Sequence, residues 1–217
     1  LKNLHKVYRR QRQMCIRDSR GALGVLAGPL NIGVIPTIAP YILPSLLKLI
    51  EDEFPDLEPR IVENQTEELL LRLRDGQIDV AVLATPTDAT GVCEIPLYEE
   101  AFAIVTSPDH PAAGRGDLDL NALKDLELLL LDDGHCLRDQ IVELCKIAEV
   151  NRTPGAQSVT RAASLTTVVQ LVVAGLGSTL VPVSALSTEC ARPGLAIAAF
   201  GPGVDAKLSL IHISEPT

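Results

Sequence analysis

The stretch Leu30-Asn-Ile-Gly-Val-Ile-Pro-Thr37 establishes the main structural pattern of the chain. Its first six residues are predicted to form a buried strand, and Pro36-Thr37 then opens a helix. The same unit recurs as a strand over 57–63, a helix capped by Thr66 and a strand over 78–83. Such alternation implies a parallel sheet with right-handed crossovers. Ligands of these sheets bind beyond the carboxyl ends of the strands, where Thr37 and Thr66 lie.

A strand over 101–106 is expected to begin a second lobe. It is followed by a short helix over 120–126 and by a buried apolar strand over 128–131. A helix that begins near Ser164 leads to further short strands, the last of which, over 195–200, is expected to run back toward the first lobe. The predicted fold class is therefore α/β with two lobes.

Residues 132–145 read Asp-Asp-Gly-His-Cys-Leu-Arg-Asp-Gln-Ile-Val-Glu-Leu-Cys. Cys136 therefore lies between a predicted strand and a predicted helix. Cys145 follows nine residues later on the same predicted helix. Nine helical residues rise about 13.5 Å, whereas a disulfide needs Cα atoms roughly 4.4 to 6.8 Å apart. The two thiols can bond only if the segment unwinds or swings. The alternative is that both cysteines are small buried hydrophobic residues.

Opposing charges surround the Cys136 thiol. The first turn of a helix favours a thiolate, and His135 and the Arg138 cation lie close to Cys136 in the sequence. Three carboxylates would raise its pKa instead: Asp132, Asp133 and Asp139. The sequence leaves the balance between these effects open.

The run Gly134-His-Cys-Leu-Arg-Asp-Gln140, with a second cysteine nine residues after the first, resembles the redox segment of the peroxide-sensing members of the LysR-type transcriptional regulators. The likeness extends from about Gly28 to Phe200. It implies a LysR effector domain with a periplasmic-binding-protein-like fold, in which each lobe is a mostly parallel sheet flanked by helices. It also implies a peroxide-sensing regulatory domain that switches through a reversible Cys136–Cys145 disulfide.

By this resemblance, Cys136 would attack hydrogen peroxide and Cys145 would resolve the product. The other residues expected around the peroxide are Thr37, Thr66, His135, Arg138 and Ser164. Some have alternative roles. The three hydroxyl residues are also good helix caps, and Arg138 is the weakest candidate because it can instead pair with Asp132 or Asp133.

The resemblance also implies the partners of such a domain. The expected assembly is a homodimer or tetramer through the regulatory domains, reset by a thiol reductant such as glutaredoxin or glutathione. DNA and RNA polymerase would be contacted only by the full-length protein, because an N-terminal winged helix-turn-helix domain is absent from this chain. We expect no cofactor, no metal site and no enzymatic activity.

Both ends of the chain resemble translated read-through of sequencing adapters, at Val7–Ser19 and Leu208–Thr217. We therefore expect four segments: an artefactual extension over 1–20, an incomplete subdomain I over 21–98, subdomain II with the redox segment over 99–207, and an artefactual tail over 208–217. Of the net charge of −9, residues 1–20 contribute +6, which leaves −15 on the remainder. An acidic domain matches a DNA phosphate backbone poorly.

Five irregularly spaced cysteines favour a reducing cytoplasm over a disulfide-rich secreted scaffold. No apolar run reaches the roughly 20 residues that span a membrane. Two other functions are compatible with the residues alone. One is a LysR-type or solute-binding domain for a small organic ligand, with structural cysteines. The other is a thiol enzyme using a Cys136–His135 pair, although adjacent residues place a histidine poorly for base catalysis.

Overall fold

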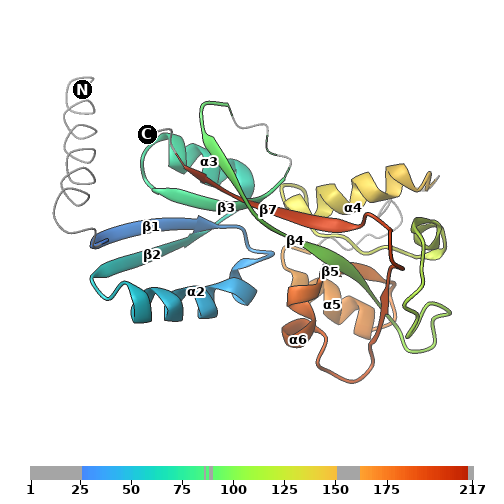
Figure 1. Cartoon of the computed structure of the whole chain (residues 1–217). Helices are drawn as coiled ribbons and strands as arrows, with labels where there is room; N and C mark the ends of the chain where they lie inside the picture. Colours follow the sequence, from blue (N-terminus) through green and yellow to red (C-terminus); the bar gives the residue numbers. More distant parts are fainter. Residues whose placement is uncertain (1–25, 86, 88–89, 151–161, 215–217) are drawn as a thin grey trace.

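The computed structural model of the chain describes residues 26–85, 87, 90–150 and 162–214 (Figure 1). The expected extension over 1–20 lies outside the described residues. In chain order, the elements are β1 (Gly28–Val34), α2 (Ala39–Glu53), β2 (Leu57–Glu63), α3 (Thr66–Arg74), β3 (Val80–Ala84), β4 (Cys93–Thr106), η1 (Leu120–Asp125), α4 (Cys136–Ile147), α5 (Leu165–Val173), β5 (Thr179–Pro182), η2 (Val183–Ala185), α6 (Leu186–Glu189), β6 (Ala196–Ala199) and β7 (Lys207–Ser214). The strand–helix alternation predicted for the first lobe is confirmed.

The strands form a continuous path in the order β2-β1-β3-β7-β4-β5, with β6 also paired to β4. β1 pairs in parallel with β2 and with β3, whereas β7 is antiparallel to both of its neighbours. We call β1, β2, β3, β7, α2, α3 and the first part of β4 lobe I. The rest of β4 with η1, α4, α5, β5, η2, α6 and β6 is lobe II. The predicted two-lobed α/β fold is confirmed (Figure 1).

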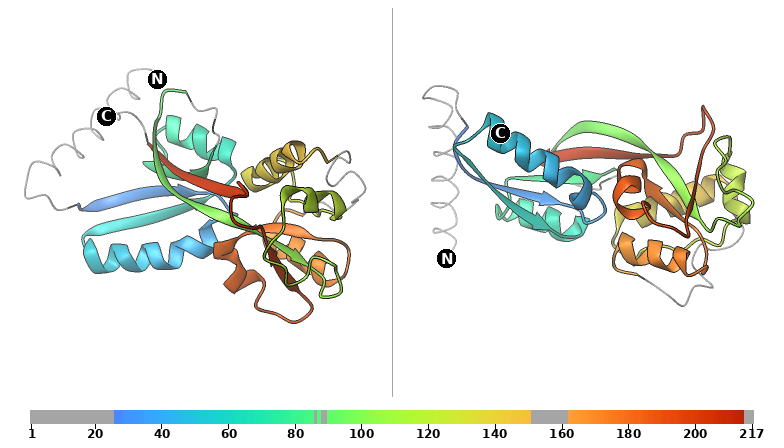
Figure 2. Two further views of the ribbon diagram at one scale, coloured as in Figure 1. Left: turned by 45° about the vertical axis from the view of Figure 1, so that its right-hand side comes forward. Right: turned by 90° about the horizontal axis from the view of Figure 1, so that it is seen from below.

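Strand β4 belongs to both lobes. Residues 93–101 pair with β7, and residues 102–106 pair with β5 and β6. The expected subdomain boundary after residue 98 therefore falls within a continuous strand. Figure 2 shows β4 and β7 running side by side from one lobe to the other. The lobes are thus joined by sheet hydrogen bonds as well as by chain connections.

Residues 207–214 form β7, which lies between β3 and β4. The sequence predicts an artefactual tail over 208–217, and the structure differs from that expectation over 208–214. Leu208, Leu210 and Ile213 are at most 1% exposed. Leu208 and Leu210 lie on one face of the strand and Ile211 and Ile213 on the other, and all four are buried, as expected of a strand in the middle of a sheet.

One large apolar cluster runs through both lobes. It includes Leu69 of α3, Phe102 of β4, Leu137 of α4 and Val168 of α5. A second, smaller cluster lies between the first strand of lobe I and α2. Because the large cluster crosses from one lobe to the other, a movement of α4 disturbs packing that the two lobes share.

Replacing Leu210 by alanine is expected to destabilise the chain by about 2 to 5 kcal/mol, because it removes buried methyl groups from a central strand. Urea unfolding followed by circular dichroism measures this change. His212→Ala is the matched control, since His212 lies on β7 and is only partly buried. Equal stability of the two variants would show that β7 does not contribute to the folded core.

Candidate functional site

The start of α4 is shaped by a turn that only glycine adopts readily. Gly134 has φ +89°, and a Cβ at this position would lie 2.5 Å from Oε1 of Gln65 in lobe I. His135 follows as the N-cap residue without a side-chain capping hydrogen bond, and Cys136 is the first residue of α4. The turn therefore brings the Cys136 backbone close to lobe I.

Cys136 is half-buried at this junction. Burial raises the pKa of its thiol above the ordinary value of 9.0. The hydroxyl of Thr37 and backbone groups of Ala84 and Leu137 act in the opposite direction, since hydrogen bonds to a thiolate lower its pKa. Asp139 adds a smaller upward effect. Desolvation is the largest of these effects, so the pKa of Cys136 is raised and its thiol is mainly protonated at neutral pH. This answers the question that the sequence left open.

The hydroxyls of Thr37 and Thr66 are buried, and neither caps a helix. The N-cap residues of α2 and α3 are Ile38 and Gln65, and neither helix has a side-chain capping hydrogen bond. The expectation that Thr66 caps its helix is therefore wrong, and so is the capping alternative for Thr37. Neither hydroxyl oxygen has a hydrogen-bond partner in the reduced structure, in which Thr37 is placed to donate to Cys136 once that thiol ionises. Burying an unpaired hydroxyl is costly, so both are suited to a small polar ligand.

His135 is 5% exposed. Burial lowers the pKa of its ring, and this effect exceeds the opposing attraction of Asp132 and Asp139. The ring is therefore neutral at pH 7 and offers one N–H donor and one acceptor. It provides no imidazolium charge to stabilise a neighbouring thiolate.

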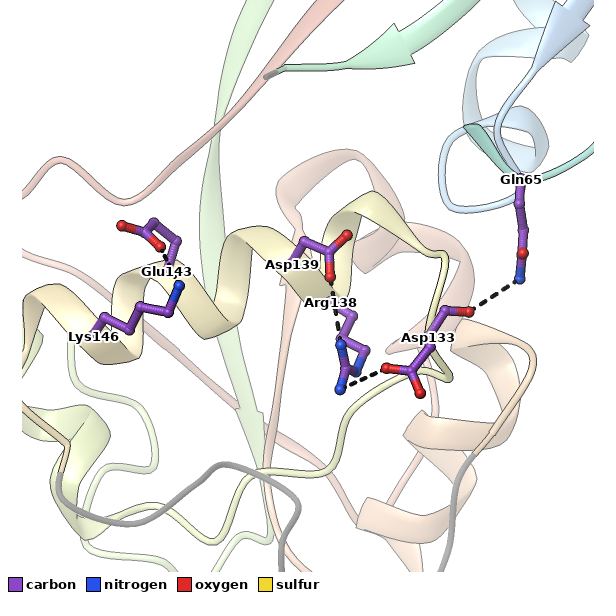
Figure 3. A network of polar contacts seen from close by, with 6 residues as sticks. All are labelled: Gln65, Asp133, Arg138, Asp139, Glu143 and Lys146. Carbon is purple, nitrogen blue, oxygen red and sulfur yellow. Dashed lines mark hydrogen bonds and ion pairs between the residues drawn. The ribbon is translucent and has the colours of Figure 1, made fainter. Parts of the chain in front are cut away.

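Arg138 forms ion pairs with Asp133 at 2.8 Å and Asp139 at 3.5 Å (Figure 3). This agrees with the alternative structural role of Arg138, with Asp133 as its closer partner. Gln65 reaches the same segment from lobe I, where its Nε2 donates to the Asp133 carbonyl oxygen at 3.4 Å. Arg138 thus helps to hold the turn that precedes α4.

Gln140, one turn along α4, makes a second contact between the lobes. Its side-chain amide donates to the carbonyl oxygen of Thr85 in lobe I. Its Oε1 and the Asp132 Oδ1 atom are buried without hydrogen-bond partners. Sequence analysis did not single out Gln65 or Gln140. Gln140 is part of the quoted run 134–140 and Gln65 is not, and only the tertiary contacts show what each side-chain amide does.

Cys145 lies on the far part of α4 and is 2% exposed. Burial raises the pKa of its thiol to about 11. Helix α4 is continuous from Cys136 to Ile147, so the two Cα atoms are separated by about 13.5 Å along the axis. The structure does not bring the two cysteines together, in agreement with the helical separation predicted from their spacing.

Ser164 is the N-cap of α5, where its hydroxyl accepts from the Thr167 backbone N–H at 3.2 Å. The capping role that the sequence allowed is therefore occupied. The segments that precede α4 and α5 lie side by side, because Asp132 N–H donates to the Ala162 carbonyl oxygen at 3.0 Å. Contact of Ser164 with a ligand stays a prediction.

Comparison with known proteins places this arrangement in a family. The model of the LysR substrate binding domain matches residues 24–215. The chain belongs to the LysR substrate binding domain family. A probable hydrogen peroxide-inducible genes activator from Mycobacterium avium is 46% identical over 196 residues, which is 90% of this chain and 62% of that protein. The DNA-binding transcriptional dual regulator OxyR of Escherichia coli K12 is 40% identical over 172 residues, 78% of this chain and 54% of that protein.

Solved structures of OxyR proteins agree with the described fold. A cysteine-to-serine mutant of OxyR from Corynebacterium glutamicum with hydrogen peroxide bound has a TM-score of 0.89 and 56% identity, covering 97% of this chain and 65% of that one. The oxidised form of the same protein has a TM-score of 0.77, with 97% of this chain and 64% of that chain covered. The chain spans roughly half to two thirds of the length of the curated relatives.

Neither a metal centre nor a membrane span is found in the described part of this LysR domain. Residues 26–85, 87, 90–150 and 162–214 contain no group of three or more His, Cys, Asp or Glu side chains that could hold a metal ion. Within the same ranges, no helix has both the length and the apolar character needed to cross a bilayer.

Thr37→Val is expected to slow alkylation of Cys136 by iodoacetamide roughly fivefold at neutral pH, which corresponds to one hydrogen bond of about 1 kcal/mol. In the unaltered chain the rate is expected to rise about tenfold per pH unit through the neutral range, because the raised pKa keeps the thiol mostly protonated there. Mass spectrometry of the Cys136 peptide over time measures both effects.

Thr66→Val is the matched control, because Thr66 is not among the groups that shift the pKa of Cys136. A rate that is independent of pH across the neutral range would contradict this account, since it would mean that Cys136 is already a thiolate.

Proposed function

We propose that this chain is the hydrogen-peroxide-sensing regulatory domain of a LysR-type transcription regulator. We propose further that it switches through a reversible Cys136–Cys145 disulfide. The observation that carries the proposal is the position of the Cys136 thiol, which is half-buried at the first turn of α4 and faces the Thr37 hydroxyl from the other lobe. The names of the curated relatives, which are activators of peroxide-inducible genes or OxyR, support it.

The proposed chemistry has two steps. In the first, the Cys136 thiolate attacks one peroxide oxygen, the O–O bond breaks, and Cys136 sulfenic acid and hydroxide form. The hydroxide takes up a proton and leaves as water. In the second, the Cys145 sulfur attacks the sulfenic sulfur, so that the disulfide forms and a second water departs. Two electrons pass from the two thiols to peroxide, and a thiol reductant such as glutathione or glutaredoxin returns them.

Each proposed pocket residue has a role that suits its surroundings. The unpaired hydroxyls of Thr37 and Thr66 are available to orient peroxide and to stabilise the charge that develops as the O–O bond breaks. A neutral His135 can donate to the departing oxygen through its ring N–H. Arg138 and Ser164 are already engaged by Asp133 and Thr167, so they would contribute mainly by fixing the starts of α4 and α5.

Disulfide formation would couple this chemistry to a change of shape. The bond requires α4 to unwind at least in part, because the intact helix keeps the two thiols apart. That movement would break the contacts of Gln140 with Thr85 and of Gln65 with Asp133, both of which join the lobes. It would also draw the buried Cys145 out of the shared core. An oxidised site would therefore alter the relation between the two lobes.

The proposed effect on transcription would be produced by the whole regulator rather than by this domain alone. Altered pairing of regulatory domains in a homodimer or tetramer would change how an N-terminal DNA-binding domain meets DNA and RNA polymerase in a reducing cytoplasm. The proposal assigns no cofactor and no catalytic turnover to the domain. It also makes an organic ligand unnecessary for switching.

Treating the reduced chain with stoichiometric hydrogen peroxide, blocking free thiols and mapping peptides by mass spectrometry tests the proposal. We expect a Cys136–Cys145 disulfide that forms at low peroxide and is absent in Cys136→Ser. In Cys145→Ser, Cys136 is expected to accumulate as sulfenic acid, because the resolving thiol is missing.

Cys190→Ser serves as the matched control, since Cys190 is also buried but lies on neither end of α4. It should leave the disulfide unchanged. Both thiols remaining reduced, or pairing of either one with Cys93 or Cys190, would contradict the proposed switch.

A further inference from the structure

A buried carboxylate joins the two lobes at a place that the redox site does not include. Glu189, at the end of α6 in lobe II, is 5% exposed. Its Oε1 atom accepts hydrogen bonds from Tyr41 Oη in α2 of lobe I at 3.1 Å and from Thr166 Oγ1 in α5 of lobe II at 3.0 Å. A single oxygen atom therefore receives one donor from each lobe.

The second carboxylate oxygen of Glu189 faces a cation. Arg192 Nη2 lies 3.8 Å from Oε2, which has no hydrogen-bond partner. Burial and the adjacent carboxylate raise the pKa of Tyr41, so its hydroxyl stays protonated as a donor. Two hydroxyl donors and a guanidinium group around a carboxylate form the kind of site that binds a small organic acid.

Glu189 and Cys136 lie on different helices of lobe II, α6 and α4. In Figure 1, α4 and α6 lie on opposite sides of the crossing strands β4 and β7. Both figures place the start of α2 beside α6, in agreement with the hydrogen bond between Tyr41 and Glu189. The lobes are therefore tied on one side by the contacts of α4 and on the other by the Glu189 carboxylate.

We propose that Glu189 is a carboxylate ligand supplied by the chain itself, which fastens lobe I to lobe II and takes the place of a bound small organic acid. The tie persists when the α4 contacts break, so movement is confined to the α4 side of the crossing strands. The site of Tyr41, Thr166 and Arg192 is already filled, and free monocarboxylates are excluded from it. The confinement of movement rests on the proposed function, whereas the occupation of this site by Glu189 does not.

Chemical rescue of Glu189→Ala in the full chain tests the proposal. Truncation leaves the Tyr41 and Thr166 hydroxyls and the Arg192 guanidinium around an empty space, so Tm should fall by about 5 °C. Sodium acetate or formate should then restore at least half of that loss in a saturable manner, relative to sodium chloride at equal ionic strength. The unaltered chain should show no such stabilisation.

Two further variants separate the carboxylate site from general stability. In Glu189→Ala/Tyr41→Phe, which lacks one of the donors, acetate should restore less than half as much as in Glu189→Ala. Glu189→Gln should resist rescue, because its side chain still fills the site. Equal Tm for Glu189→Ala and the unaltered chain, or equal acetate effects on both, would overturn the proposal.

If Glu189→Ala does not fold even in acetate, Tyr41→Phe tests the proposal instead. It should lower Tm by about 3 °C, because it leaves the buried carboxylate with one donor fewer. Tyr98→Phe is its control, since Tyr98 is 40% exposed on β4. Equal Tm values for these two tyrosine variants would overturn the proposal.

Discussion

Nine residues of intact helix hold the Cys136 and Cys145 thiols apart, and the surrounding structure depends on that separation. A disulfide between them cannot coexist with α4 in its present form. The helix is stabilised by its packing in the shared core, through Leu137, Ile141 and Leu144. The free energy gained by forming the disulfide would have to offset the free energy lost when this packing is disrupted. A rigid helix thereby allows a local chemical event to alter tertiary structure.

The environment of Cys136 combines two opposing influences. Desolvation keeps the thiol protonated, whereas the Thr37 hydroxyl and nearby backbone groups favour the thiolate. This combination limits reaction with bulky or charged reagents but leaves donors in place for a small neutral molecule such as peroxide. The buried hydroxyls of Thr37 and Thr66 support the same interpretation. Buried donors without partners lower stability, so their presence indicates a role in binding. Reactivity would then come from the arrangement of donors around peroxide more than from a low thiol pKa.

Much of the fold follows from local sequence patterns. The alternation of apolar runs with helix starts predicted the three parallel strands of lobe I, and the run 132–145 predicted a helix that begins near Cys136 and includes Cys145. Two sets of features did not follow. The resemblance of residues 208–217 to translated adapter sequence predicts no structure there, although residues 207–214 form strand β7 with apolar side chains on both faces. The contacts of Gln65, Gln140 and Glu189 join residues that are between 55 and 148 positions apart. No periodicity encodes such pairs, because they arise only when the lobes come together.

Hydrogen exchange over residues 136–147 tests the central claim most directly. The amides of α4 are expected to be protected in the reduced chain and to exchange much faster once the Cys136–Cys145 disulfide has formed, while α2 and α6 keep their protection. Peptide-resolved mass spectrometry measures both states in the same sample series. Unchanged protection of α4 in a chain that carries the disulfide would contradict the claim that the helix must open.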